Sequence, residues 1–201
     1  MIRAKSPAAE RNKGPILDVL RRVLPTEGLV LEIASGSGQH VLHFAEELPD
    51  LRFVPSDPSS EARQSIAGYL AQTALPNVMP PREIDVTRPA WEADIGETLA
   101  AVVCINMIHI APIEAMFGLL RGAANKLAPG APLVLYGPYR FHGVFLAPSN
   151  EAFSRDLASR NPAWGVRDVD EIAEAATVAG FAMEEPLAMP ANNHVLVLRR
   201  A

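Results

Sequence analysis

The sequence has a single cysteine and no extended basic cluster. One cysteine cannot form an internal disulfide, and it gives no spacing typical of a metal site. Cys104 lies in the apolar run 100–105, which predicts a buried thiol that packs like a small hydrophobic side chain. Adjacent basic residues occur only in pairs such as Arg21-Arg22 and Arg199-Arg200, and the net charge is −5 at pH 7. Because phosphate binding needs clustered Lys and Arg, no nucleic-acid partner is expected.

Signals for export or membrane insertion are also lacking. The N-terminal stretch MIRAKSPAAERNKG has no apolar core of a secretory signal. The most apolar window, residues 99–120, is interrupted by Asn106, His109, Pro112 and Glu114, which makes it a poor membrane span. We therefore expect a cytoplasmic protein without a membrane partner. The chain has 201 residues, of which 49% are hydrophobic, enough for one domain over residues 1–201.

Hydrophobic periodicity predicts alternating strands and helices. The expected strands are residues 29–33, 51–54, 82–84, 101–106, 132–136, 181–187 and 194–200. The expected helices are residues 14–24, 38–48, 57–73, 113–127, 149–159 and 167–179, the first opening at Gly14-Pro15. This alternation predicts an α/β fold with a seven-stranded, mostly parallel sheet and helices on both faces. Residues 190–193 between the last two strands indicate a C-terminal antiparallel hairpin.

The turn after the first strand, Glu32-Ile33-Ala34-Ser35-Gly36-Ser37-Gly38, indicates a ligand site. In open α/β sheets ligands bind at the carboxyl ends of strands, and glycine lets the backbone approach a ligand closely. The dinucleotide pattern G-x-G-x-x-G is incomplete because Val41 occupies its third glycine position, and no lysine of a phosphate-binding loop follows. Glu32 would repel a pyrophosphate and would suit a cationic ligand or an amino group. The alternative is an ordinary strand-to-helix turn.

A second carboxylate, Asp57, follows the second strand 19 positions after Gly38. Its two oxygens can accept hydrogen bonds from both hydroxyls of a ribose. The alternative is that Asp57 caps the helix that begins near Pro58.

Together these motifs resemble the class I S-adenosylmethionine (SAM)-dependent methyltransferases. The first motif of that class is an acidic residue followed by G-x-G-x-G, with Ala34 here in place of the first glycine. Five stretches resemble, more narrowly, a bacterial methyltransferase-like family known only as a domain of unknown function. They are RNKGPIL (11–17), EIASGSGQH (32–40), PSDPS (55–59), SNEAF (149–153) and NPAWGVRDVDEI (161–172). The resemblance implies a Rossmann-like class I methyltransferase fold with SAM as cofactor, and it implies no particular substrate.

The resemblance also implies roles for individual residues. Asp85 would meet the adenine amino group, Val86 would pack on the adenine ring, and Asn106 with Met107 would lie beside the sulfonium. An N-terminal arm, residues 1–14, would fold over the cofactor, with Arg11-Asn12-Lys13 nearest to it. The expected cofactor-binding residues are Asn12, Glu32, Ala34, Ser35, Gly36, Gly38, His40, Asp57, Pro58, Asp85, Val86, Asn106 and Met107.

Methyl transfer from a sulfonium needs little acid–base chemistry, because the leaving group is a neutral thioether. Alignment and exclusion of water are the main contributions, and a base helps only if the acceptor must lose a proton. His109, Tyr139 and His142 are the candidates for such a base, although none is paired in sequence with an orienting carboxylate. A structural histidine and a surface loop are the alternatives. The D/N-P-P-Y/F motif of amine-methylating nucleic-acid enzymes is absent, which favours a small-molecule acceptor.

Two other function classes stay open. The first is a non-catalytic module that binds SAM or a partner protein. The second is a nicotinamide-dependent reductase, which Glu32 and the missing third glycine disfavour. No metal is expected, and the sequence is compatible with a homodimer.

Overall fold

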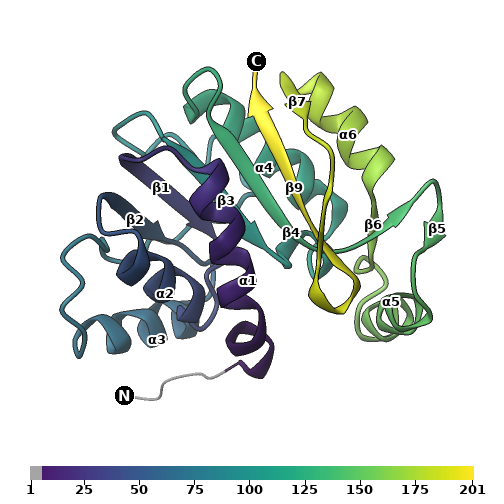
Figure 1. Cartoon of the computed structure of the whole chain (residues 1–201), viewed down its shortest axis with the longest axis horizontal. Coiled ribbons are helices and arrows are strands. Elements are labelled where there is room, and N and C mark those ends of the chain that lie inside the picture. Colours follow the sequence, from purple (N-terminus) through teal and green to yellow (C-terminus); the bar gives the residue numbers. More distant parts are fainter. Residues whose placement is uncertain (1–5) are drawn as a thin grey trace.

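The computed structural model describes residues 6–201, and residues 1–5 of the expected N-terminal arm lie outside the described residues. Helices cover both faces of a central sheet (Figure 1). The helices are α1 (Pro7–Val23), α2 (Gln39–Glu47), α3 (Ser60–Leu70), α4 (Ile113–Lys126), α5 (Pro148–Arg160) and α6 (Val169–Val178), with 3-10 turns η1 (Met107–His109) and η2 (Pro190–Asn192). The strands are β1 (Gly28–Ile33), β2 (Leu51–Pro55), β3 (Ala101–Ile105), β4 (Pro132–Phe141), β5 (Val144–Phe145), β6 (Arg167–Asp168), β7 (Phe181–Met183), β8 (Leu187–Met189) and β9 (Asn193–Arg200).

The sheet runs in the order β2-β1-β3-β4-β9-β7. Strands β2, β1, β3 and β4 are parallel to one another, and β9 is antiparallel to both β4 and β7. The α/β class with a mostly parallel sheet and a closing antiparallel hairpin is therefore confirmed. Because β1 lies between β2 and β3, the strand order reverses there, and the carboxyl ends of these strands border a switch point where ligands bind in such folds.

The sheet has nine strands in the described part of the chain rather than the expected seven. The additional strands β5 and β6 are two residues long and pair with the far end of β4. The expected strand over 181–187 is divided into β7 and β8, with Pro186 between them. The expected strand over 82–84 forms only an isolated bridge between Ser56 and Arg82. Pro80 and Pro81 precede it and have no N–H to donate to a ladder.

The first helix begins earlier than the sequence suggested. The Ser6 hydroxyl accepts a hydrogen bond from the N–H of Ala9 at 3.3 Å, and Pro7 occupies the first turn, where a missing N–H costs nothing. Pro15, expected to open the helix, lies inside it. Residues 7–14 of the expected arm are therefore helical.

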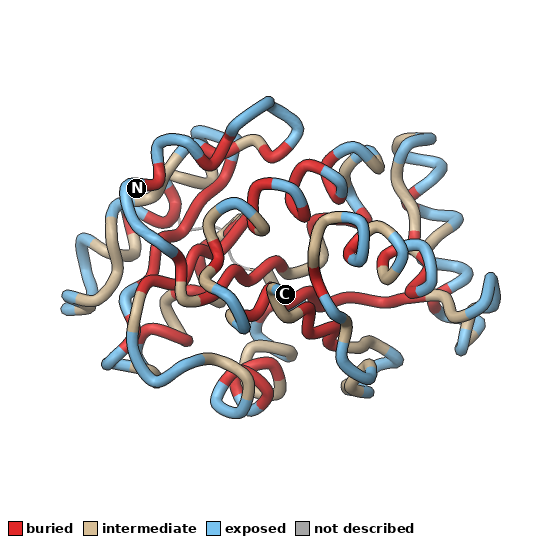
Figure 2. The backbone as a smooth tube through the Cα atoms, turned by 90° about the horizontal axis from the view of Figure 1, so that it is seen from above, coloured by how far each residue is buried: buried red, intermediate tan, exposed pale blue. Residues whose placement is uncertain are grey.

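Two apolar clusters, one on each face of the sheet, form the core. One includes Phe44 of α2 and Leu20 of α1, and the other includes Leu119 of α4 and Ile172 of α6. Figure 2 shows the buried chain running through the middle of the molecule, with exposed segments around it. Cys104 is 2% exposed, which confirms the expected buried thiol. Within residues 6–201, no helix combines the length and apolar character needed to cross a membrane.

Candidate functional site

The turn after β1 has the backbone shape that glycines favour. Ala34, Gly36 and Gly38 have φ values of 55°, 54° and 87°, all in the left-handed region. An L-residue with a side chain adopts this region at a cost of about 1–2 kcal/mol. Ala34 therefore keeps the conformation of the glycine it replaces in the motif. A Cβ added to Gly38 would lie 2.9 Å from Cγ1 of Ile66, whereas one added to Gly36 would meet nothing within 4 Å.

Asp57 holds this turn in place. Its Oδ2 accepts a hydrogen bond from the N–H of Gly36 at 3.0 Å, and its Oδ1 accepts one from the N–H of Ser59 at 2.9 Å. The side chain of Ser59, rather than that of Asp57, caps α3 by accepting from the N–H of Ala62. Asp57 thus joins the turn after β1 to the turn after β2. Each of its oxygens keeps acceptor capacity for a ligand hydroxyl.

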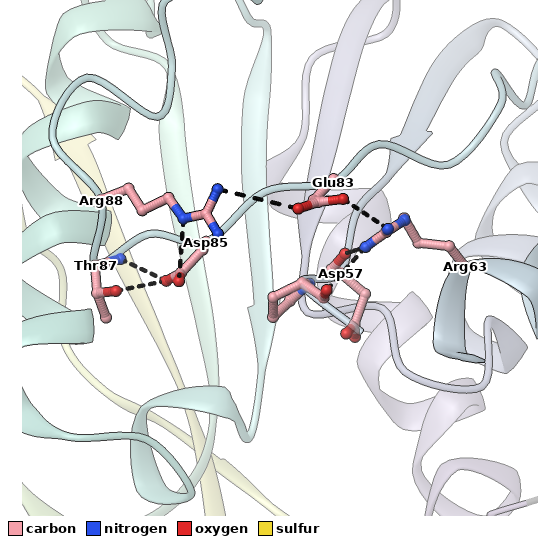
Figure 3. A network of polar contacts seen from close by, with 7 residues as sticks. Asp57, Arg63, Glu83, Asp85, Thr87 and Arg88 are labelled. Carbon is pink, nitrogen blue, oxygen red and sulfur yellow. Dashed lines mark hydrogen bonds and ion pairs between the residues drawn. The ribbon is translucent and has the colours of Figure 1, made fainter. Parts of the chain in front are cut away.

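A chain of polar contacts links Asp57 to the loop that follows residue 82 (Figure 3). The Arg63 guanidinium donates to the Asp57 carbonyl at 2.8 Å and to the Glu83 carboxylate at 2.7 Å. Arg88 lies 4.0 Å from the other oxygen of Glu83. These contacts fix the position of this loop relative to α3.

Asp85 lies at the other end of this chain of contacts. Its Oδ1 accepts hydrogen bonds from the hydroxyl of Thr87 at 2.6 Å and from the N–H of Thr87 at 3.0 Å, and Arg88 lies 3.7 Å from Oδ2. The Thr87 hydroxyl is the main cause that lowers the pKa of Asp85, so this carboxylate is ionised at neutral pH. It can accept a hydrogen bond from a ligand amino group.

A cleft of about 500 Å³ opens between these groups at the carboxyl ends of β1, β2 and β3. Its volume suits a small molecule. It brings together six of the expected cofactor residues, namely Ala34, Asp57, Pro58, Asp85, Val86 and Met107. The other residues that line it are Ile33, Ile84, Thr87, Ile110, Ala111, Pro112, Ala115 and Trp164. A hollow of about 570 Å³ between α1, α2 and α3 contains none of the expected site residues among those described.

Close packing of α4 holds the loop that carries Asp85 and Val86. A Cβ added to Gly118 would lie 1.9 Å from the carbonyl oxygen of Val86, so only glycine fits. The indole N–H of Trp91, further along the same loop, donates to the Gly118 carbonyl at 2.9 Å. Sequence reasoning missed Ala115 and the apolar residues 110–112. Their one signal was an apolar segment directly after a buried strand, where polar loop residues are more usual.

Glu32 is buried, with 2% of its surface exposed. Neither of its carboxylate oxygens has a hydrogen-bond partner among residues 6–201. Burial, with a smaller contribution from the nearby Asp57 charge, raises the pKa of Glu32 to about 8, and the nearby Ser35 side chain opposes this rise. A buried carboxyl group without a partner is costly, and such perturbed groups cluster at functional sites.

The remaining expected cofactor residues are not among the described residues that line the cleft. They are Asn12, Glu32, Ser35, Gly36, Gly38, His40 and Asn106. Asn12 Oδ1 lies 2.7 Å from His40 Nε2, which joins α1 to α2. Burial lowers the pKa of His40 to about 4, so its ring is neutral at physiological pH. Asn106 has a φ of 61°, which turns the chain sharply after β3.

The three candidate bases are not among the described residues that line the cleft. His109 is 1% exposed, its ring meets Tyr139 edge-on at 5.1 Å, and burial lowers its pKa to about 3. Tyr139 is fully buried, which raises its pKa well above the usual value. His142 is exposed on the turn between β4 and β5, and its Nδ1 lies 2.7 Å from Asp170. The structure therefore does not bring these groups to the site.

The fold is that of known methyltransferases. An O-methyltransferase family protein from Burkholderia thailandensis superposes with a TM-score of 0.78 at 18% identity, over 95% of this chain and 57% of that chain. Human N-acetylserotonin methyltransferase in complex with SAM gives a TM-score of 0.74 at 12% identity, over 94% of this chain and 52% of that one. The chain spans a little over half the length of these proteins.

Residues 3–200 match the family described as a protein of unknown function, DUF938. The match covers almost the whole chain, and the resemblance to a class I methyltransferase-like family of unknown function is confirmed. This protein belongs to the DUF938 family and has the fold of the SAM-dependent methyltransferases.

Proposed function

We propose that this protein is a SAM-dependent methyltransferase that acts on a small-molecule acceptor. The observation that carries the proposal is the cleft, where Asp57 and Asp85 lie beside the apolar side chains of Val86 and Met107. The cleft lies at the switch point of the sheet, next to the glycine turn.

The residues present fit the cofactor. Asp57 would accept hydrogen bonds from the ribose hydroxyls, Asp85 would accept from the adenine amino group, and Val86 would pack on the adenine ring. Gly36 leaves room for a ligand, because an added Cβ would meet nothing within 4 Å. Glu32, buried without a partner, would be satisfied by a cationic group. When bound, SAM supplies a methyl group on a positively charged sulfur.

The chain itself would contribute binding, alignment and exclusion of water. Among the described residues, those lining the cleft include no histidine, cysteine, lysine or tyrosine. The carboxylates that line it, Asp57 and Asp85, are assigned to cofactor contacts in this proposal, so we assign no general base to the cleft. This fits a nucleophile that arrives at the cleft in its reactive form.

The same observation favours a second candidate, a module that binds SAM without catalysis. The two candidates differ in turnover. The purified protein would be incubated with SAM and a panel of small nucleophiles, including phenols, thiols and amines, and the demethylated product S-adenosylhomocysteine (SAH) would be quantified by mass spectrometry. Acceptor-dependent SAH formation that Asp57→Asn reduces supports the enzyme. SAM binding without acceptor-dependent SAH formation supports the module.

A further inference from the structure

Trp164 lines the cleft although it lies far along the chain from the other lining residues. It belongs to the segment 161–167 between α5 and β6, and it is the one aromatic side chain among the described residues that line the cleft. The guanidinium of Arg160 lies 5.4 Å from the ring centroid. An aromatic surface therefore lies at the site.

Arg167 joins this segment to residues 108–111, which lie between β3 and α4. Its Nη2 donates to the carbonyl of Ala111 at 2.7 Å and to that of Ala163 at 2.9 Å, and its Nε donates to the carbonyl of Ile108 at 2.9 Å. Hydrogen bonds to a charged donor are about twice as strong as neutral ones. Trp164 is thus held beside Ala111, which also lines the cleft.

His109 adds a second connection between the same two segments. Its carbonyl accepts a hydrogen bond from the N–H of Gly165 at 2.9 Å, and its Nδ1 accepts from the N–H of Arg167 at 3.4 Å. Burial keeps the ring neutral, so Nδ1 retains the lone pair that this contact needs. His109 does not line the cleft, and it therefore acts by connecting the two segments that do.

The cleft that Val86 and Trp164 both line has mostly apolar side chains. Gly118 packs directly against the carbonyl of Val86, which lies beside Asp85. Ala115 and Pro112 line the cleft from the first turn of α4, and Ala111 follows next to Trp164. A planar aromatic ligand in this cleft would lie among these apolar side chains, and the indole is the one aromatic side chain there among the described residues.

We propose that Trp164 is a ligand-contacting residue whose indole packs against the adenine ring of the cofactor, and that Arg167 is the positioning residue that holds it there. Adenine is the one planar aromatic group in SAM, and packing a base on an aromatic side chain is strongly favourable. This inference rests on the proposed function, because it takes SAM as the ligand of the cleft.

The test measures the affinity of SAH and of adenosine by calorimetry for the wild type, Trp164→Phe and Trp164→Ala. Loss of the indole should weaken both ligands by about tenfold or more and by the same factor, because the shared nucleoside carries the contact. Trp164→Phe, which keeps an aromatic face, should stay within about threefold of the wild type. Phe117→Ala is the matched control, since Phe117 is an aromatic residue 48% exposed on α4 outside this cleft.

Arg167→Lys tests the positioning role. Acrylamide quenching of tryptophan fluorescence should increase in this variant, and SAH should bind about fivefold or more weakly. The reason is that lysine lacks the planar guanidinium whose several N–H groups bind the three carbonyls together. Trp91 is 9% exposed and is little accessible to the quencher, and Trp164→Phe identifies the signal of Trp164. Unchanged quenching and unchanged affinity in Arg167→Lys would overturn the positioning role.

The outcomes separate the two proposals. If the wild type binds SAH and Trp164→Ala binds it equally well, the contact assigned to Trp164 is wrong and the proposed function stands. If the wild type binds neither SAH nor adenosine, both proposals fail.

Discussion

Replacing Glu32 by glutamine should stabilise the unliganded protein while weakening the binding of SAM. Glutamine keeps the shape of the side chain and removes its charge. The pKa of Glu32 is raised from 4.5 to about 8 in the folded state, so the folded protein binds this proton more tightly than the unfolded chain. The stability that this preference gives is fully present below pH 4.5 and is lost as the pH rises through 8.

The size of the effect follows from the pKa values. A pKa difference of one unit corresponds to about 1.4 kcal/mol. Because the unfolded chain ionises at Glu32 more readily than the folded protein, the free energy of unfolding of the wild type is lowered by about 3 kcal/mol at pH 7 and by about 5 kcal/mol above pH 8. Glu32→Gln should therefore raise the free energy of unfolding by about 3 kcal/mol at pH 7. The gain in the free energy of unfolding should be small at pH 5, because this pH is close to the unfolded-state pKa of 4.5 and the wild type has lost little stability there.

Urea denaturation followed by far-UV circular dichroism at pH 5, 7 and 8.5 measures this difference. Glu185→Gln is the control, since Glu185 is exposed and its replacement should leave the pH dependence unchanged. A wild-type stability that does not fall between pH 5 and 8.5, or a variant no more stable at pH 7, would refute the reasoning. In the same variant SAM should bind about tenfold or more weakly, because glutamine cannot ionise to pair with the cationic ligand as Glu32 can. Greater stability with unchanged affinity would mean that Glu32 has no contact with the ligand.

Four further substitutions test the glycine turn. Asp57→Ala should weaken SAM binding about tenfold or more, measured by calorimetry; a loss of thermal stability alone would restrict Asp57 to holding the N–H groups of the turn. Gly38→Ala should lower the free energy of unfolding by about 2 kcal/mol or more, because left-handed backbone strain adds to the contact with Ile66, whereas Gly36→Ala should cost only the strain of about 1 kcal/mol and still impair SAM binding. Equal stability losses at the two glycines would contradict the assigned contacts. Ala34→Gly should stabilise the fold by no more than about 1 kcal/mol, because relief of strain is offset by unfolded-chain entropy, and chemical denaturation would detect a larger change.

The strands and helices with long, regular apolar patterns were predictable from the sequence. The expected helix over 113–127 is α4 (Ile113–Lys126), and the expected strand over 29–33 is β1 (Gly28–Ile33). The spacing of apolar residues indicates which face of an element is buried, and in these two elements the buried face and the type of secondary structure are both as the spacing predicts. The start of α1 was missed because a serine cap and a proline in the first turn favour Pro7, whereas the later Pro15 looked like a second start.

One error at the site concerns where a strand ends. The strand expected to end at Tyr136 continues to Phe141, because β9 pairs with residues up to Pro138 and β6 pairs with Tyr139. Tyr139 is therefore a buried strand residue and not part of an open loop. The residue types of 164–167 suit either part of a lid or a Trp anchor that packs a helix on the sheet, and the contact of Arg167 with Ala111 leaves no periodic signal that would decide between them. Asp57 and Asp85 were predictable because each follows an expected strand directly.

The central claim is that the glycine turn and the adjoining cleft bind the methyl donor. Calorimetric titration of the purified protein with SAM, with SAH and with reduced nicotinamide adenine dinucleotide tests it most directly. We expect SAM and SAH to bind in the micromolar range and the nicotinamide cofactor not to bind. Failure of both SAM and SAH to bind, or preferential binding of the nicotinamide cofactor, would contradict it.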